Sequence, residues 1–335
     1  MRKVLYMLRR IAKLDYKGMF RRVSEVKRHS KRPSVFIFFD MIYCGFHYGA
    51  GYMDYAACRF DKLNSKQRAT YVTRGINDGY VAKYNDQRYR DDFVIKTKFN
   101  AIFGDFLKRS WIGVQDASHD DVIEWLATHD PVFAKPVAGT GGHFMEVLSR
   151  ADFANIDDAY QHLIDNGLDL LEEVVVQDDQ MARLNRGCVN TIRIVTFIDD
   201  ANVTRVMFAC LRMGTGDNIV DNFHHAGLTT PIEIETGILR FPAVSKDGDV
   251  YDIHPTSGVP IVGFQIPRWD ECIDFTIKAS QVVPQVRYVG WDVALTKDGP
   301  VLIEGNEAPG NDLYQMPAFL PDGMGLLPRF RQYMK

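Results

Sequence analysis

The pattern of apolar and polar positions changes along the chain at about residue 132. Beyond that point, short apolar runs alternate with Gly and Asp-Gly pairs, which is typical of strands joined by tight turns. Helical spacing predicts helices at 151–165 and 270–283. Six apolar runs are predicted strands: residues 132–137, 170–176, 190–198, 203–211, 289–296 and 301–304. The expected fold class is therefore α+β, with a sheet rich in antiparallel pairs.

Before residue 132 the pattern predicts helices instead. Residues 96–110 and 119–128 look helical, and Pro131 ends the second of these helices. The preceding stretch mixes aromatic and charged side chains and has few alternating runs. We therefore predict a mainly helical N-terminal region at 1–95, followed by a second domain at 96–335.

Residues 33–53 contain a single charge, Asp40, and need their own explanation. Their length would allow a membrane span, but Gly45, Gly49 and Gly51 dilute the apolar run. A buried segment is the interpretation that we favour.

Charge is distributed unevenly along the chain. The 335 residues carry a formal net charge of -3, which gives no indication of a nucleic-acid partner. Residues 1–32 hold 12 Lys and Arg against Asp15 and Glu25, a balance of +10, which leaves -13 on the rest. Residues 2–14 are predicted to form a basic amphipathic helix. It either packs on the protein's own acidic body or binds an acidic partner or anionic lipid at the inner face of the membrane.

Cysteine usage favours a reducing compartment. The five cysteines are odd in number and no pair has CxxC spacing, so neither a disulfide framework nor a structural zinc site is expected. Arg9 and Arg10 interrupt the first apolar stretch, and no signal peptide is evident. We predict buried free thiols and a cytoplasmic protein.

The strongest chemical pattern is a predicted hairpin around an Asp-Gly turn at 297–299. A three-residue connection would place Asp292 opposite Glu304, with Asn306 on the same face. Two opposed carboxylates repel each other, and one takes up a proton unless a cation lies between them. Magnesium prefers such oxygen ligands. Because the strand is otherwise apolar, a magnesium site is favoured over three solvated side chains.

A lysine at the end of a predicted strand precedes a glycine-rich loop. Lys135 would supply a point charge for a phosphate, and the loop amides can approach phosphate oxygens closely. The loop residues are Gly139, Thr140, Gly141 and Gly142. The sequence is neither a Walker A motif nor a GxGxxG fingerprint, and such a loop is more often an ordinary turn.

Two acids, Glu172 and Glu173, interrupt the apolar run at 170–176. A backbone edge at this point can read an adenine amino group, as a linker between two lobes would. An edge strand with solvated acids is the alternative.

Arg193 and Arg212 belong to predicted apolar strands and are expected to project into a site. Guanidinium groups suit bidentate recognition of phosphate or carboxylate, although a structural ion pair is an equal alternative for each. In the segment 221–227, His224 or His225 could act as a base or bind substrate, but metal ligation is not expected.

Taken in order, these pieces resemble the ATP-grasp superfamily. The residues that carry the resemblance are Lys96 or Lys98, Lys135 with its glycine loop, Glu172 to Val175, Arg193, Arg212, Asp292, Glu304 and Asn306. Residues 304–310 look like the metal-binding strand and turn of D-alanine–D-alanine ligases. More closely, the chain is similar to the sugar-transfer-associated ATP-grasp family, over roughly residues 35–320. The sequence pattern of that family is matched by five segments: 51–55, 96–100, 190–193, 221–223 and 288–292.

The resemblance implies two α+β subdomains that grip ATP, with a lid subdomain at about 131–176. It implies phosphate contacts from Lys96 (or Lys98) and Lys135, an adenine site lined by Glu172, Glu173 and Val175, a ribose contact from Asp179, and magnesium on Asp292, Glu304 and Asn306. The loop Gly139–Gly142 would cover the phosphates. Two features depart from the family pattern. The N-terminal region does not resemble the usual Rossmann-like first domain, and Glu307 stands where a small or basic residue is more usual.

The implied function is that of an ATP-dependent carboxylate–amine ligase in surface polysaccharide or glycoconjugate biosynthesis. A substrate carboxylate would attack the γ-phosphate to give an acyl phosphate, which an amine from an amino acid or amino sugar would then attack. Arg193, Arg212 and Asn306, with the backbone amides that follow it, would stabilise the developing charge. Contact with glycosyltransferase machinery is a further expectation. Two alternatives stay open: a kinase that phosphorylates a small molecule, and a protein that binds nucleotide without turnover.

Overall fold

The computed structural model describes residues 15–137, 145–216, 221, 223, 227–311 and 313–334. The chain forms two compact units: Met1–Gly79 with Gln315–Arg331 (unit 1), and Tyr80–Tyr314 with Gln332–Lys335 (unit 2). This division differs from the predicted boundary at residue 95, because a C-terminal segment returns to unit 1. There the Gln315 side chain bonds both backbone groups of Val72, each at 2.9 Å, and the Leu327 amide donates to the Thr70 carbonyl.

Unit 1 is helical, as the N-terminal sequence predicts. Its elements are α2 (Tyr16–Arg28), α3 (Ser34–His47), α4 (Tyr52–Ala57), η1 (Phe60–Lys62), α5 (Ser65–Arg68), the start of α6 (Arg74–Tyr84), η4 (Pro317–Phe319) and α14 (Leu327–Arg331). Asp15 begins α2 by accepting a hydrogen bond from the Gly18 amide at 3.0 Å. One apolar core joins α2, α3 and α4 through residues such as Val23, Ile37 and Tyr55. The predicted amphipathic helix at 2–14 lies outside the described residues.

Helix α3 corrects the prediction that residues 33–53 are a buried segment. Ile37, Met41 and Cys44 are buried in the core of unit 1, whereas Phe36 and Phe39 are exposed. An apolar helix thus has one covered face and one uncovered face. Among the described residues, no helix has both the length and the apolar character needed to cross a bilayer.

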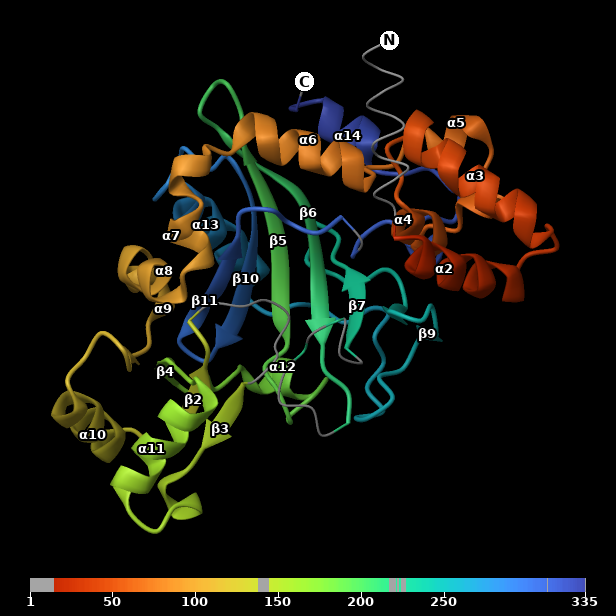
Figure 1. Cartoon of the computed structure of the whole chain (residues 1–335). Helices are drawn as coiled ribbons and strands as arrows, with labels where there is room; N and C mark the ends of the chain where they lie inside the picture. Colours follow the sequence, from red (N-terminus) through yellow and green to blue (C-terminus); the bar gives the residue numbers. More distant parts are fainter. Residues whose placement is uncertain are drawn as a thin grey trace. The chain divides into compact units, whose positions relative to one another are not determined.

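Unit 2 contains two antiparallel sheets (Figure 1). The larger has seven strands in the order β11-β10-β5-β6-β7-β8-β9. These strands are β5 (Thr191–Ile198), β6 (Thr204–Met213), β7 (Leu228–Pro231), β8 (Ala243–Ser245), β9 (Val250–Tyr251), β10 (Tyr288–Thr296) and β11 (Gly299–Asn306). The smaller sheet has the order β1-β4-β2-β3, from β1 (Trp111–Gly113), β2 (Val132–Lys135), β3 (Glu146–Leu148) and β4 (Leu170–Glu173).

The helices of unit 2 cover these sheets. They are η2 (Gln87–Tyr89), α7 (Asp91–Val94), α8 (Lys96–Ile102), α9 (Gly104–Leu107), α10 (His119–Thr128), η3 (Arg150–Asp152), α11 (Ile156–Asn166), α12 (Asp179–Ala182) and α13 (Trp269–Ser280). Helix α13 packs against β5, β10 and β11, while α10 and α11 share a core with the small sheet. All six predicted strands are present, and the prediction of an α+β fold is confirmed.

The small sheet is larger than the predicted lid at 131–176. The sheet begins at β1, before the predicted lid. Helix α10 packs on this sheet, because Val122 and Leu126 are buried in the core that the two share. Strands β1, β3, β7, β8 and β9 were not predicted. Each has only two to four residues, which is too short to display an alternating pattern.

All five cysteines are free and buried, in agreement with the prediction of unpaired thiols. Burial raises the pKa of Cys44, Cys188 and Cys272 to about 12, so these thiols are protonated at neutral pH.

Candidate active site

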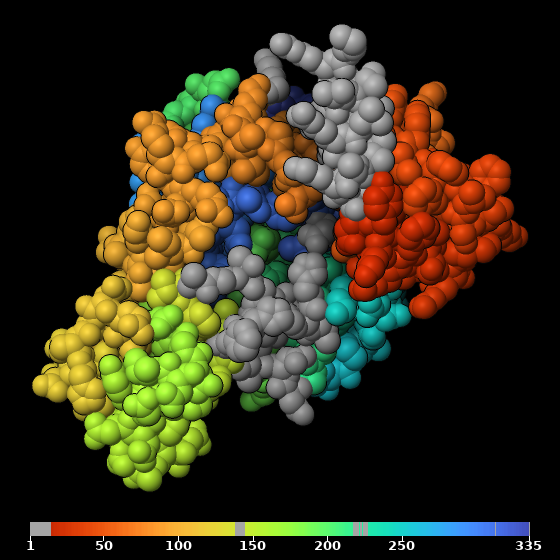
Figure 2. All heavy atoms as spheres, viewed as in Figure 1, coloured from red at the N-terminus to blue at the C-terminus, as the bar shows by residue number. Residues whose placement is uncertain are grey.

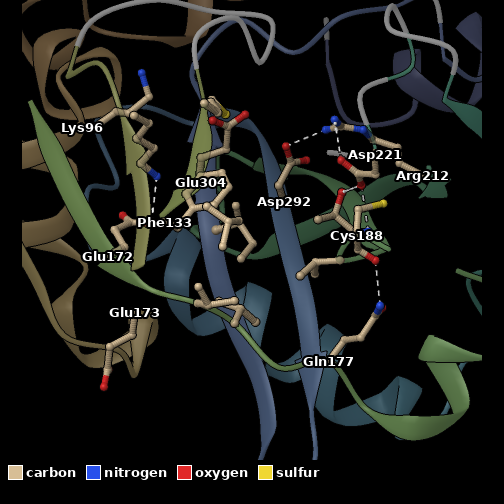
Figure 3. A pocket seen from close by; sticks show the side chains of 18 of the residues that line it. Lys96, Phe133, Glu172, Glu173, Gln177, Cys188, Arg212, Asp221, Asp292 and Glu304 are labelled. Carbon is tan, nitrogen blue, oxygen red and sulfur yellow. Dashed lines mark hydrogen bonds and ion pairs between the residues drawn. The ribbon is translucent and has the colours of Figure 1, made fainter. Parts of the chain in front are cut away.

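A cavity of about 590 Å³ lies in unit 2 and is lined by residues of both sheets (Figure 3). Phe133 and Lys135 come from β2, Glu172 from β4, and Arg212 and Asp292 from β6 and β10. Its volume falls within the usual range of small-molecule sites. Most of the residues predicted from the sequence therefore meet in one place.

A row of charged side chains crosses three neighbouring strands at the cavity; Asp292 and Glu304 of this row line the cavity, and Arg193 does not. Arg193 of β5 lies beside Asp292 of β10, and Asp292 lies opposite Glu304 of β11. Because directly opposite residues point to the same face of a sheet, the three side chains meet. The predicted pairing of Asp292 with Glu304 is confirmed.

This pairing arises differently from the way we expected. The turn has two residues rather than three, since Thr296 pairs with Gly299. In that register Asp292 would face Ile303. A β-bulge at Ile303 shifts the register by one residue and brings Glu304 to the face of Asp292. The bulge is thus part of the site.

The two carboxylates have opposite electrostatic environments. Burial by itself would raise the pKa of Asp292, but Arg193 and Arg212 hold it at about 2. Burial and the neighbouring Asp292 carboxylate raise the pKa of Glu304. Asn306 lies within reach as well, since its Nδ2 is 3.3 Å from Glu304 Oε1. A cation beside Glu304 would favour its charged form.

Arg193 and Arg212 both bind Asp292. Arg193 donates from Nε to Oδ1, and from Nη2 to Oδ2 at 2.9 Å, while Arg212 Nη1 donates to Oδ2 at 2.7 Å. Arg212 Nη2 also donates to Asp221 Oδ1 at 3.1 Å. The Nε of Arg212 is buried and has no hydrogen-bond partner among the described residues. A buried donor of this kind is costly, so Arg212 is held at this position by its contacts with Asp292 and Asp221 at some expense in stability.

Asp221 is a site residue to which the sequence analysis gave no role. It is buried and accepts hydrogen bonds from the amide of Thr191, at 2.9 Å, and from its hydroxyl. Burial raises the pKa of Asp221, although Arg212 opposes this. Asp221 lies in a loop after β6 and has no strand pattern around it. Apart from its place in the 221–227 segment, the sequence therefore gives no indication of its role. It orients Arg212 toward the cavity.

A second buried cluster surrounds Glu172 in the small sheet. Lys135 Nζ lies 2.9 Å from Glu172 Oε2, and Arg109 Nε donates to the same oxygen at 3.1 Å. Asn100 donates to Oε1 at 2.7 Å. Burial alone would raise the pKa of Glu172, but Arg109 and Lys135 hold it at about 2. The carboxylate is thus fully committed to protein contacts.

Arg109 also links the small sheet to the large one. Its Nη1 donates to the Leu302 carbonyl of β11 at 2.6 Å while its guanidinium pairs with Glu172 of β4. The sequence analysis missed Arg109 because it lies in a short connection between α9 and β1, where no pattern marks it.

The structure separates the two lysines that were joint candidates for a phosphate contact. Lys96 lines the cavity, and burial together with the nearby Lys135 charge lowers its pKa. Lys98 is exposed and does not line the cavity. Both belong to α8, where two residues correspond to more than half a turn, so their side chains leave the helix on nearly opposite sides. Lys96 is the better candidate.

The segment after β4 passes the cavity as an extended strap. The Glu173 side chain is directed away from the cavity (Figure 3), and its Oε2 accepts the Ser110 amide at 2.6 Å. The Glu173 amide donates to the Ser110 carbonyl at 3.0 Å, so this amide is not free to contact an adenine ring. No backbone hydrogen bond links Val175 to another described residue, and Asp179 lines the cavity at the start of α12.

Several predicted residues lie outside the described part of the chain. They are Gly139, Thr140, Gly141 and Gly142 of the glycine loop, and His224 and His225. Glu307, which departs from the family pattern, lines the cavity and has its charge offset by Arg90, with Nε 3.4 Å from Oε1.

The donors around Glu304 fit a magnesium ion. The described residues contain no group of three His, Cys, Asp or Glu side chains able to hold a metal, so any such site needs an amide or a ligand oxygen as well. Asp292, Glu304 and Asn306 provide two carboxylates and an amide. Magnesium commonly completes such a set with substrate phosphates and water. The raised pKa of Glu304 is the expected signature of two carboxylates that share a site without a cation.

Comparison with known families fits this arrangement. The model of the family described as sugar-transfer associated ATP-grasp matches residues 76–335, which include both sheets and the cavity. The protein belongs to this family, and its two α+β subdomains form the ATP-grasp fold. No curated protein matches the sequence.

Three solved structures illustrate the fold-level similarity. The ATP-grasp ligase PsnB, complexed with a minimal precursor, is 15% identical over 75% of this chain and 65% of its own, with a TM-score of 0.40. The ADP complex of purK, an N5-carboxyaminoimidazole ribonucleotide synthetase, is 13% identical over 66% and 46%, with a TM-score of 0.42. The D-alanine–D-alanine ligase from Bacillus anthracis, complexed with ATP, is 10% identical over 72% and 66%, with a TM-score of 0.41. The chain thus spans less than two thirds of each of these proteins.

Proposed function

We propose that this protein is an ATP-dependent carboxylate–amine ligase that uses magnesium. The observation that carries the proposal is the pair of carboxylates Asp292 and Glu304, which line the cavity together with Arg212 and lie in a row with the buried Arg193, in a member of an ATP-grasp family. Opposed carboxylates beside buried guanidinium groups suit the binding of a metal-complexed polyphosphate.

The nucleotide is proposed to lie between the strap after β4 and the Asp292–Glu304 pair. The unbonded backbone of Val175 would face the adenine ring, with Glu173 beside it, and Asp179 would face the ribose. Lys96 and Lys135 would contact phosphate oxygens. Lys135 already has one carboxylate partner in Glu172, which holds it at the cavity wall.

The proposed reaction has two steps. An oxygen of the substrate carboxylate attacks the γ-phosphorus, the bond to the β–γ bridging oxygen breaks, and ADP leaves. An amine then attacks the acyl carbon of the resulting acyl phosphate, the carbon–oxygen bond breaks, inorganic phosphate leaves, and the nitrogen loses a proton to solvent. The net change converts a carboxylate, an amine and ATP into an amide, ADP and phosphate.

The residues of the site would divide this work. Arg193 and Arg212 would offset charge on the transferred phosphoryl oxygens, and Asp292 holds both guanidinium groups in place. The backbone amides after Asn306 would lie near the acyl oxygen. Magnesium held by Asp292, Glu304 and Asn306 would supply additional positive charge at the phosphates.

The substrates are proposed from the family description alone. An association with sugar transfer suggests a carboxylate or amine carried by a saccharide or an amino acid, within glycoconjugate assembly.

We also retain the proposal that residues 1–14 bring the enzyme to the inner face of the membrane. Deleting residues 1–14 should then remove salt-sensitive vesicle binding and keep ADP release. An insoluble product would indicate instead that this segment packs on the protein.

The test is a screen of amino acids and uronic acids for ADP release, with amine acceptors present and mass analysis of the products. An ATP-dependent amide would support the ligase. A stable phosphorylated small molecule would identify the kinase alternative. Nucleotide binding without any ADP release, across the whole screen, would point to a protein that binds nucleotide without turnover.

A further inference from the structure

Helix α3 of unit 1 has apolar side chains on two opposite faces. Ile37, Met41 and Cys44, spaced by four and three residues, are buried in the core. Phe36, Phe39 and Tyr43 repeat the same spacing on the opposite side and are exposed. Phe36 is 65% exposed and Phe39 is 62% exposed. Val35 and Phe46 extend this exposed face toward the two ends of the helix.

The single charge of α3 is turned away from this face. Asp40 accepts hydrogen bonds from Arg68, at 2.8 Å and 2.7 Å, and from the Tyr55 hydroxyl at 2.7 Å. Burial would raise the pKa of Asp40, but these two partners lower it, so the carboxylate stays ionised within unit 1. The outer face of α3 is therefore free of charged side chains.

The aromatic face continues onto the neighbouring helix α2. Phe20, which is 57% exposed, stacks on Phe38 with ring centroids 5.2 Å apart, and Phe38 meets the edge of Phe39 at 5.5 Å. We call Val35, Phe36, Phe39, Tyr43 and Phe46, together with Phe20, the aromatic face. The helices that carry it are among the red elements at the molecular surface in Figure 2.

Basic side chains border the aromatic face. Lys17 and Arg21 are exposed helix neighbours of Phe20, and Lys31 lies just before α3. These three, and Arg28, form no ion pair with another described residue. Residues 16–32 as a whole contain seven Lys and Arg and one acid, Glu25, which pairs with Arg22. Positive charge is thus concentrated next to exposed aromatic rings.

We propose that the aromatic face docks unit 1 onto an anionic membrane surface, with α3 lying in the plane of the interface. An exposed apolar patch of this kind marks an interaction site. Aromatic side chains favour the headgroup region, and Lys and Arg nearby gain from anionic lipids. With 14 residues, α3 measures about 21 Å, well short of the roughly 30 Å apolar thickness of a bilayer. It can lie on the membrane but cannot span it.

The charge pattern favours a membrane over a second copy of the chain. In a symmetric contact between two copies, the same basic residues would face each other around the apolar centre, and like charges at close range cost binding energy. An anionic leaflet offers the opposite charge over its whole surface. This inference concerns unit 1 and does not depend on the proposed ligase chemistry of unit 2.

The test is sedimentation of the full-length protein with vesicles of phosphatidylcholine, with and without phosphatidylglycerol. The wild type should bind the anionic vesicles, and F36S/F39S should bind them at least about tenfold more weakly, because two exposed apolar side chains no longer insert. K17E/R21E should also weaken binding to anionic vesicles. V250S/I253S, which alters exposed apolar residues of unit 2, is the matched control and should bind like the wild type.

Three results would overturn the proposal. One is F36S/F39S binding with wild-type affinity, including the case in which only removal of residues 1–14 abolishes binding. Another is a wild type that binds no vesicle at low salt, as expected if a protein partner covers the aromatic face. The third is a wild-type dimer in light scattering that F36S/F39S converts to a monomer. Unchanged thermal unfolding of F36S/F39S and K17E/R21E would confirm that both variants are folded.

Discussion

Two glutamates line the same cavity in opposite electrostatic situations. Glu172 in the small sheet accepts from Lys135, Arg109 and Asn100, which hold its pKa at about 2. Glu304 in the large sheet faces the carboxylate of Asp292, and its pKa is raised. Burial is common to both, so the neighbours decide the difference. The positive partners of Glu172 outweigh its burial, whereas Arg193 and Arg212 do not outweigh burial and the Asp292 carboxylate at Glu304.

The largest effect expected from this contrast is on stability. Glu172→Gln would leave Lys135 and Arg109 buried without their counter-charge, which should lower the free energy of unfolding by about 3–5 kcal/mol. Urea denaturation measures this. Glu173→Gln on the same strand is the matched control, and its effect should stay below about 1 kcal/mol because that side chain is half-exposed and Gln keeps an oxygen for the Ser110 amide. Equal losses in the two variants would show that the Glu172 cluster is not a structural ion-pair network.

A smaller effect is expected at Asp221, which binds Arg212 but is not part of the Asp292–Glu304 pair. Asp221→Asn keeps a similar shape but removes the charge that holds Arg212 Nη2. Turnover should fall about tenfold, corresponding to ~1.4 kcal/mol, with little change in the KM for ATP. Steady-state kinetics of ADP release provide the measurement. Thr191→Val, which loses one hydrogen bond to Asp221, should show the same change to a lesser degree. A change in KM alone would contradict a positioning role.

The smallest effect is the pH dependence of stability without metal. The folded pKa of Glu172, about 2, lies below its ordinary value of 4.5, so its stabilisation is complete above pH 4.5 and is lost as the pH falls toward 2. Glu304 has the opposite sign: its folded pKa is raised, so stability declines as the pH rises from 4.5 through that pKa. Denaturation of Glu304→Gln and the wild type from about pH 3 to about pH 7 should show the second slope in the wild type only. Parallel curves would refute the raised pKa.

The acidic pair could be predicted from the sequence because a short hairpin leaves few registers. Asp292 and Glu304 are separated by one turn, and the apolar residues around them fix which face is buried. The bulge at Ile303 could not be predicted, since no residue in this strand requires it. The predicted turn was one residue longer than the observed turn. The bulge adds one residue to β11, so the predicted pairing is nevertheless correct.

Residues that act across the fold were beyond the reach of sequence patterns. Arg109 and Asp221 lie in connections, and their roles depend on partners 63 and 9 positions away. The exposed half of α3 was also missed, because an apolar run shows that a segment is apolar but not how many of its faces are covered. Tertiary packing decides that.

The central claim is that Glu304 completes a magnesium site for phosphoryl transfer. Its most direct test is the magnesium dependence of ADP release by Glu304→Gln, with thermal unfolding of the same protein in metal-free buffer. We expect turnover to fall at least about a hundredfold, because charge stabilisation at the phosphates is lost. The unfolding temperature should not fall, because the amide relieves the repulsion from Asp292. A folded variant with wild-type, magnesium-dependent turnover would contradict the claim.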